Sequence, residues 1–380
     1  MQKIPFYRTS LDKQGIDFIA KSLTKNGKDL VDEFEGNINK FFNSKYAIST
    51  NSGTSAIHLA LCAMKLKRAD KFICSVNSFP NIAQSIRHFD AEPIFVDIND
   101  DDFNINIDSF EAVLKEHKHK KLKGAFITHI AGQAADMKEI YEIAKKYDLK
   151  IIDDASTAIG VSYGDKKIGS IKDSFISCFQ AAPQAISDSM AMAGFFVTDD
   201  EEISQRARLI RNHALVYQQN SKDEELNYIY DITDIGQQYS ISGVCASYAA
   251  LVFKKTSDMI KRRKEIAAIY DKELGDCPHI QIPVAKKEHI YTQYIIKVDK
   301  NRDDFAKELF ERGVKTSLHY IPVYLLSYYK QKYNFKINDF PNALRVYGQI
   351  LSLPIYANLS DDEVYYICEQ IKNVVASRAY

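Results

Sequence analysis

Six short apolar runs, separated by longer segments with helical periodicity, constrain the fold of this chain most strongly. Each run has the length and composition of a strand that is buried on both faces. Strands that alternate with helices in this way form a mostly parallel sheet with helices on both sides. The sequence therefore predicts an α/β fold. The runs are Tyr46 to Thr50, Lys71 to Ser75, Pro93 to Asp97, Gly124 to Thr128, Lys150 to Asp153 and Ser174 to Ser177.

The second part of the chain has a different organisation. A segment from about Val244 to Leu274 is predicted to be one long helix that leads out of the α/β part. Beyond it the pattern predicts two further helices and three strands, at Tyr291 to Val298, Val314 to His319 and Ile350 to Leu353. We therefore predict a large domain, residues 1–245, and a smaller C-terminal α+β domain, residues 246–380.

Charge and composition exclude several classes of protein. The 380 residues include 50 basic and 50 acidic side chains, so a net charge of zero argues against nucleic acid or an anionic membrane as the main partner. No apolar stretch approaches the roughly 18 residues of a membrane span, and the N-terminus lacks the apolar region of a signal peptide, so we expect a cytoplasmic protein. The six cysteines are scattered singly without metal-ligand spacing, which favours buried thiols and no metal site.

Polar residues follow the first predicted strand at a helix start. The turn contains Gly53, Thr54 and Ser55, and backbone amides and hydroxyls at a helix N-terminus can hold a phosphate. Serine and threonine at such positions are also common helix caps, so the turn alone leaves both interpretations open.

Two carboxylates, Asp153 and Asp154, stand at the carboxyl end of another predicted strand. Ligands of open α/β sheets lie at this edge, where a carboxylate can pair with the nitrogen of a pyridine ring. A strand-end aspartate can also simply cap the next helix. Phe79, which follows the second strand, could stack on a ligand or belong to the core.

Taken in order along the chain, these segments resemble the DegT/DnrJ/EryC1/StrS family of sugar aminotransferases. Asp153 to Ala158 is similar to the family pattern EDAAQA, and the turn at Gly53 is similar to its NGT turn. The resemblance covers nearly the whole chain and implies the aspartate-aminotransferase-like fold type I. Other similar segments are Ala91 to Asp97, Ile127 to Met137, Arg208 to His213, Ser317 to Pro322 and Ile350 to Tyr356.

The resemblance also implies roles for the matching residues. Asp154 would pair with the pyridine nitrogen of pyridoxal 5′-phosphate, which becomes pyridoxamine 5′-phosphate when glutamate donates its amine. It implies a homodimer with shared active sites and a sugar aldehyde or ketone as acceptor. The implied cofactor contacts are Gly53, Thr54, Ser55, Phe79, Asp154, Thr157, Ser177 and, reaching the neighbouring subunit's site, Asn212. The implied substrate contacts are His129, Gln180, His319 and Tyr320.

One departure from the family pattern bears directly on catalysis. Gln184 stands where the family has the lysine that forms a Schiff base with the cofactor. A carboxamide can neither form this imine nor move a proton near neutral pH. Three interpretations follow: a relative of the sugar dehydratases, a non-catalytic cofactor-binding homologue, or a deliberate Lys→Gln substitution that traps a substrate adduct. We favour the third, because the rest of the cofactor site remains.

Further departures concern the substrate. Thr157 replaces the glutamine of the family pattern, Ser240 replaces an arginine and Gly243 replaces a glutamate. Changes beside a shared cofactor site indicate a different substrate in the same pocket. The loop after position 184 resembles that of family members that aminate the C8 aldehyde of Kdo, which favours 8-oxo-Kdo, a sugar of lipopolysaccharide synthesis, as acceptor. A nucleotide-linked keto sugar is the alternative.

Overall fold

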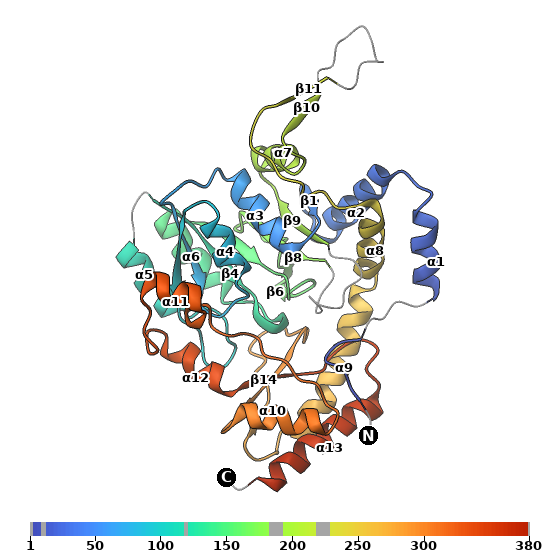
Figure 1. Cartoon of the computed structure of the whole chain (residues 1–380), viewed down its shortest axis with the longest axis vertical. Helices are drawn as coiled ribbons and strands as arrows, with labels where there is room; N and C mark the ends of the chain where they lie inside the picture. Colours follow the sequence, from blue (N-terminus) through green and yellow to red (C-terminus); the bar gives the residue numbers. More distant parts are fainter. Residues whose placement is uncertain (1–2, 9–12, 118–120, 182–192, 218–228, 379–380) are drawn as a thin grey trace.

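A seven-stranded sheet forms the centre of the structure (Figure 1). This computed structural model describes residues 3–8, 13–117, 121–181, 193–217 and 229–378. All neighbouring strands are parallel except at β9, which runs antiparallel to both of its neighbours. The prediction of a mostly parallel sheet is confirmed. In spatial order the strands are β1 (Tyr46–Thr50), β9 (Gly194–Thr198), β8 (Ile176–Gln180), β5 (Lys150–Asp154), β4 (Leu122–Thr128), β2 (Lys71–Ser75) and β3 (Glu92–Val96).

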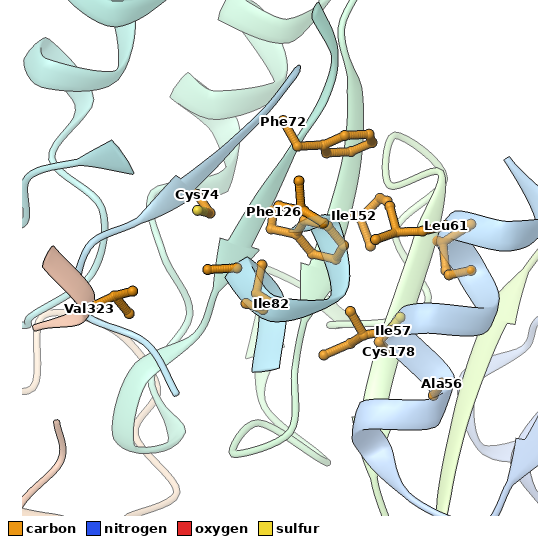
Figure 2. Packing of buried hydrophobic residues seen from close by; sticks show 14 of the residues in the cluster. Ala56, Ile57, Leu61, Phe72, Cys74, Ile82, Phe126, Ile152, Cys178 and Val323 are labelled. Carbon is orange, nitrogen blue, oxygen red and sulfur yellow. The ribbon is translucent and has the colours of Figure 1, made fainter. Parts of the chain in front are cut away.

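Helices cover both faces of this sheet, as its strands, apolar on both sides, require. One face packs against α3 (Gly53–Ala63), α4 (Asn81–Arg87) and α7 (Glu201–Ile210). Figure 2 shows part of this layer, where Ile57 and Leu61 of α3 meet Phe126 and Ile152 of the sheet. The other face packs against α2 (Gly27–Phe42), α5 (Ile107–His117), α6 (Met137–Tyr147) and α8 (Gly243–Lys254).

A smaller antiparallel sheet lies in the C-terminal part of the chain. Its order is β12 (Ile280–Gln281), β13 (Tyr294–Val298) and β14 (Ile350–Leu353), and it packs with α9 (Thr256–Leu274), α10 (Arg302–Glu311) and α13 (Asp361–Ser377) around a third core. Ile4 is buried in the same core. Two short helices, α11 (Ser327–Tyr333) and α12 (Pro341–Gln349), pack instead against the large sheet's core.

The prediction of one helix from Val244 to Leu274 is wrong in detail. Two helices, α8 and α9, meet at Lys255, whose backbone departs from helical geometry at φ −88° and ψ 2°. The N–H of Lys255 bonds to the carbonyl of Val252, three residues back, which tightens the last turn of α8. The helix before the break, α8, packs on α2, and the helix after it, α9, packs on α13. The break therefore lies where the packing partner changes.

Two other predictions about the C-terminal part need correction. Val314 to His319 is not a strand, because Val314 and Ser317 make only isolated bridges, to Ile4 and Ser352. Four helices, not two, follow α9. The run at Val314 has the composition of a strand, but it pairs at only one residue with Ile4 and at only one residue with β14.

A hairpin formed by β10 (Leu215–Tyr217) and β11 (Tyr230–Ile232) projects from the body of the large unit beyond α7 (Figure 1). Its large apolar side chains are exposed, among them Tyr230 at 59% and Ile232 at 55%. The remaining elements are α1 (Lys13–Ser22), the small ribbon of β6 (Ser162–Tyr163) and β7 (Lys166–Lys167), and two short 3₁₀ turns, Ile130–Gly132 and Val323–Leu325.

Candidate cofactor and substrate site

The N-terminus of α3 forms a cradle at the carboxyl end of β1. The side chain of Ser52 caps the helix by accepting from the Ser55 N–H at 3.1 Å, and the Ser55 hydroxyl donates to Asn51 Oδ1 at 2.6 Å. The Gly53 N–H donates to Gln180 Oε1 at 3.2 Å. Among the described residues, no partner is recorded for the exposed side chain of Thr54. The Gly53 and Ser55 amides thus bond within the protein, and the exposed Thr54 hydroxyl is available to a ligand.

A glycine on the neighbouring strand makes this cradle possible. A Cβ atom at Gly194 would lie 2.2 Å from the backbone of Ser52, so β9 can approach the turn only without a side chain. A Cβ atom at Gly53 would lie 2.6 Å from Gln180 Oε1. The structure thus brings the predicted residues Gly53, Ser55 and Gln180 together.

Asp154 ends β5 at the same edge of the sheet and is only 5% exposed. Its Oδ1 accepts from the Ser156 hydroxyl at 2.6 Å and from the Ser156 N–H at 3.3 Å. Its Oδ2 has no donor among the described residues. Burial raises the pKa of this carboxyl above its ordinary range. A buried carboxylate with one unused oxygen suits a cationic N–H donor, such as a protonated pyridine.

Asp153 points to the opposite face of the sheet, as alternation along a strand requires. Its Oδ2 accepts from the hydroxyls of Ser174 and Ser177, at 2.6 and 2.7 Å. Ser177, a predicted cofactor contact, is therefore buried and donates its hydroxyl proton to Asp153. Its role toward a cofactor stays a prediction.

His129, a predicted substrate contact, is completely buried beside Asp153. Its Nδ1 accepts from the Ala135 N–H at 3.2 Å, and its Nε2 lies 3.5 Å from Asp153 Oδ1. The carbonyl of His129 accepts from the Thr157 hydroxyl at 2.5 Å. The imidazole reaches no solvent in this structure, and its predicted contact with a substrate stays a prediction.

An aromatic residue of the C-terminal part, Tyr320, lies beside Phe79, which follows β2. Tyr320 lies 6.2 Å from Phe79, ring centre to ring centre, and its N–H donates to Asn77 Oδ1 at 3.3 Å. Phe79 is 39% exposed, so its ring is available to a ligand. Burial, together with the charge of Asp154, raises the pKa of Tyr320 to about 12. The Nδ1 of His319 lies 2.8 Å from the Ser352 hydroxyl, and burial lowers the pKa of His319 to about 4.

Asn212 is exposed in the loop between α7 and the projecting hairpin. The residue before it, Arg211, belongs to a buried ion cluster that the sequence analysis missed. Glu35 accepts from Arg208 Nη1 at 2.7 Å, from Arg211 Nη1 at 2.6 Å and from the backbone N–H of Ser49 at 2.9 Å. The available signal was an acidic residue on the buried face of α2, where an unpaired charge would be costly.

Position 184 lies outside the described residues.

Comparisons with known proteins agree with this fold. The model of the DegT/DnrJ/EryC1/StrS aminotransferase family matches residues 12–372, so the chain belongs to this family. It is 33% identical to an uncharacterized protein of Methanocaldococcus jannaschii, over 98% of each chain. It is 29% identical to UDP-4-amino-4,6-dideoxy-N-acetyl-beta-L-altrosamine transaminase of Campylobacter jejuni, over 97% of this chain and 98% of that one.

Solved structures show the same fold. The Helicobacter pylori aminotransferase PseC, involved in pseudoaminic acid biosynthesis, superposes with a TM-score of 0.88 at 24% identity, over 99% of this chain and all of that one. The putative sugar aminotransferase Spr1654 of Streptococcus pneumoniae, in its PMP form, superposes with a TM-score of 0.90 at 23% identity, over 98% and 99% of the chains. The cofactor of this family is pyridoxal 5′-phosphate, and the fold type I prediction is confirmed.

The described residues fit this cofactor. The α3 cradle suits its phosphate, the unused oxygen of Asp154 suits its ring nitrogen, and the exposed face of Phe79 suits its ring.

No group of three or more metal-ligating side chains occurs in the described parts of the chain. None of the helices described has the length and apolar character that a membrane crossing requires.

Proposed function

We propose that the natural activity of this chain is the transfer of an amino group from glutamate to the carbonyl carbon of a sugar. The observation that carries the proposal is the buried carboxylate of Asp154, which ends β5 with one oxygen unused at the same sheet edge as the α3 cradle. An electron-withdrawing ring bound there would supply the sink for the electrons released when a C–H bond breaks.

Each residue of the site has a distinct task in this proposal. Asp154 holds a proton on the ring nitrogen, because a carboxylate that is buried and otherwise half-satisfied gains most from a cationic partner. The amides at the start of α3 bind the phosphate and fix the position of the ring. Phe79 and Tyr320 cover the ring and exclude water. A lysine at position 184 would move the proton between the substrate carbon and the cofactor.

Gln184 would remove that last task. We propose that it is a substitution for the family lysine, one that leaves cofactor binding possible and stops proton transfer. The loss of a well-placed proton carrier raises a barrier by roughly 7 to 11 kcal/mol, judged from the effective molarities of oriented groups. The dehydratase and the non-catalytic interpretations remain the alternatives. Amino transfer by the Gln184→Lys variant would distinguish our proposal from both.

For the acceptor we propose an acidic keto sugar, 8-oxo-Kdo, with a nucleotide-linked keto sugar as the alternative. The relative from Campylobacter jejuni is named for a UDP-linked sugar, and a further relative, from Escherichia coli O157:H7, is named GDP-perosamine synthase. This chain lacks the family arginine at Ser240 and the family glutamate at Gly243. A Cβ atom at Gly243 would lie 2.8 Å from Gly27, so close packing of α8 on α2 gives a structural reason for the second change.

We also propose a homodimer. The projecting β10–β11 hairpin exposes Tyr230, Ile232 and nearby Ile235, which is 86% exposed, immediately beyond the loop that carries Asn212. Large apolar side chains gathered on one projection favour burial against another surface. A second copy of the chain would cover them and would bring Asn212 to the neighbouring site.

The activity can be tested by mass spectrometry of the products. The Gln184→Lys variant, supplied with pyridoxal phosphate and glutamate, should convert 8-oxo-Kdo to a product whose mass shows one amine in place of the carbonyl oxygen. The same variant with Asp154→Asn should lose several powers of ten in rate, because a neutral ring is a poor electron sink. An active Gln184→Lys variant that uses only nucleotide-linked keto sugars would establish the alternative acceptor.

A further inference from the structure

A buried arginine that has no carboxylate partner in the described parts of the chain lies beside the candidate site. Arg263, on α9, is only 5% exposed. Its Nε donates to the carbonyl of Ile290 at 3.2 Å, and among the described residues neither terminal nitrogen has a hydrogen-bond or ion-pair partner. Burial lowers the pKa of Arg263 to about 10, which still leaves it charged at neutral pH. A buried charge that stays unpaired is costly, so a counter-ion would be bound favourably.

The side chain of Arg263 lines a hollow between α9 and the end of β5. The hollow is also lined by Ser156, Thr157, Thr292, Phe253 and Met259. The Ser156 hydroxyl donates to Asp154 and the Thr157 hydroxyl donates to the carbonyl of His129. The guanidinium is therefore the strongest donor left to face the hollow.

The hollow adjoins the candidate cofactor site, because Ser156 and Thr157 belong to both. Thr157 has a shorter side chain than the glutamine of the family pattern, and its hydroxyl is turned back to the main chain. The hollow itself lies between Arg263 and the residues that follow β5. A planar group with two oxygens could enter that space and take two N–H donors from the guanidinium.

We propose that this hollow is a carboxylate-binding subsite in which Arg263 holds the acid group of a substrate. The inference rests on the proposed function for its ligands, which are either the dicarboxylic amino donor or the acidic keto sugar. Both sources present the same chemistry, a carboxylate on a flexible chain that also carries a reacting group. The guanidinium would then orient the substrate relative to Asp154.

Binding can be measured without turnover, which separates this proposal from the proposed activity. Isothermal titration of the full chain would use three probes: glutarate as an unreactive donor mimic, Kdo as the acidic sugar, and glutaramide as the uncharged control. At least one carboxylate should bind saturably, and glutaramide should not. Arg263→Gln should weaken that binding by at least about tenfold, the loss of a charge-assisted contact. The carboxylate that is affected identifies the source.

The neighbouring arginine provides a matched control. Arg262 is on the same helix, but it pairs with Asp361 at 2.7 Å and with the carbonyl of Leu359 at 2.6 Å. Arg262→Gln removes the same charge and should leave carboxylate binding unchanged. Equal weakening by both variants, or no saturable binding of either carboxylate, would overturn the proposal.

A second measurement uses the unaltered chain, in case Arg263→Gln fails to fold. Crystals soaked in bromide should show an anomalous peak next to the terminal nitrogens of Arg263. Bromide peaks elsewhere on the protein, with none at this guanidinium, would also overturn the proposal. Neither outcome depends on whether the chain transfers amino groups.

Discussion

The imidazole of His129 faces the carboxylate of Asp153, with 3.5 Å between Nε2 and Oδ1 and both side chains completely buried. Since Nδ1 accepts from the Ala135 N–H, the ring proton is on Nε2 and points toward the carboxylate. Asp153 belongs to β5 and His129 follows β4, so the two side chains meet at the ends of neighbouring strands.

Asp153→Asn should therefore destabilise the fold. The amide would remove the buried negative charge that lies 3.5 Å from His129 Nε2 and that accepts from the hydroxyls of Ser174 and Ser177. We expect a loss of about 2 kcal/mol in the free energy of unfolding, measured by urea denaturation. Glu142→Gln, at an exposed position of α6, should change it by less than about 0.5 kcal/mol. Equal stabilities of the two variants would show that the pair contributes nothing.

The Glu35 cluster should make the free energy of unfolding depend on pH. Burial alone would raise the pKa of Glu35, but Arg211 and Arg208 reverse this effect and hold the pKa below its usual value of 4.5. The unfolded chain binds the proton first, so the stabilisation is complete well above pH 4.5 and is lost as pH falls through the folded-state pKa. In urea denaturation, the unaltered chain and Glu35→Gln should differ in free energy of unfolding, and this difference should become smaller from pH 7 to pH 3.5. A difference that stays constant over this range would mean that the charge of Glu35 does not contribute to stability.

Three histidines should remain uncharged in mildly acidic solution. Burial lowers the pKa values of His58, His289 and His319 to about 4 each. Because the ordinary value is 6.5, the unfolded chain takes up these protons first, and stability should fall between about pH 7 and pH 4. Imidazole NMR signals of the folded protein, assigned with His58→Gln and matching variants, should stay constant from pH 8 to pH 5.5. Midpoints near 6.5 would contradict the burial described here.

The projecting hairpin should control assembly. Replacing Tyr230 and Ile232 together by aspartate puts two charges where a second copy should bury apolar surface. We expect a dimer for the unaltered chain and a monomer for this variant in analytical ultracentrifugation. Phe310→Asp, at a 66% exposed position of α10, is the control and should leave the dimer intact. A variant at the hairpin that still dimerises would place the interface elsewhere.

The periodic parts of the fold could be predicted from the sequence, because buried strands need continuous apolar runs. Tyr46–Thr50 and Lys71–Ser75 were predicted with the observed ends. The break at Lys255 could not be predicted, since the residues around it are compatible with a helix and only the change of packing partner ends α8. The run at Val314 is not a strand, because it pairs at a single residue with Ile4 and at a single residue with β14, and the sequence pattern does not reveal such isolated bridges.

For the site, sequence patterns placed Asp154 and the turn at Gly53 at one sheet edge. They could not show that Ser177 donates to Asp153 or that the imidazole of His129 is buried. Both depend on the face of the sheet to which a side chain points, and this face follows from the strand register, which the sequence patterns do not give. Arg263 stood in the sequence as one of three basic residues in a helix. Arg263 differs from Arg262 in its burial and in having no carboxylate partner among the described residues.

The most direct test of the account asks whether the side chain at position 184 meets a cofactor held by Asp154 and the α3 cradle. Both the unaltered chain and the Gln184→Lys variant would be incubated with pyridoxal phosphate, reduced with borohydride, digested and examined by mass spectrometry. The account predicts a pyridoxyl group on the peptide containing position 184 in the variant, and no modified lysine in the large unit of the unaltered chain. A variant that remains unmodified at position 184, or an unaltered chain modified at another lysine there, would contradict it.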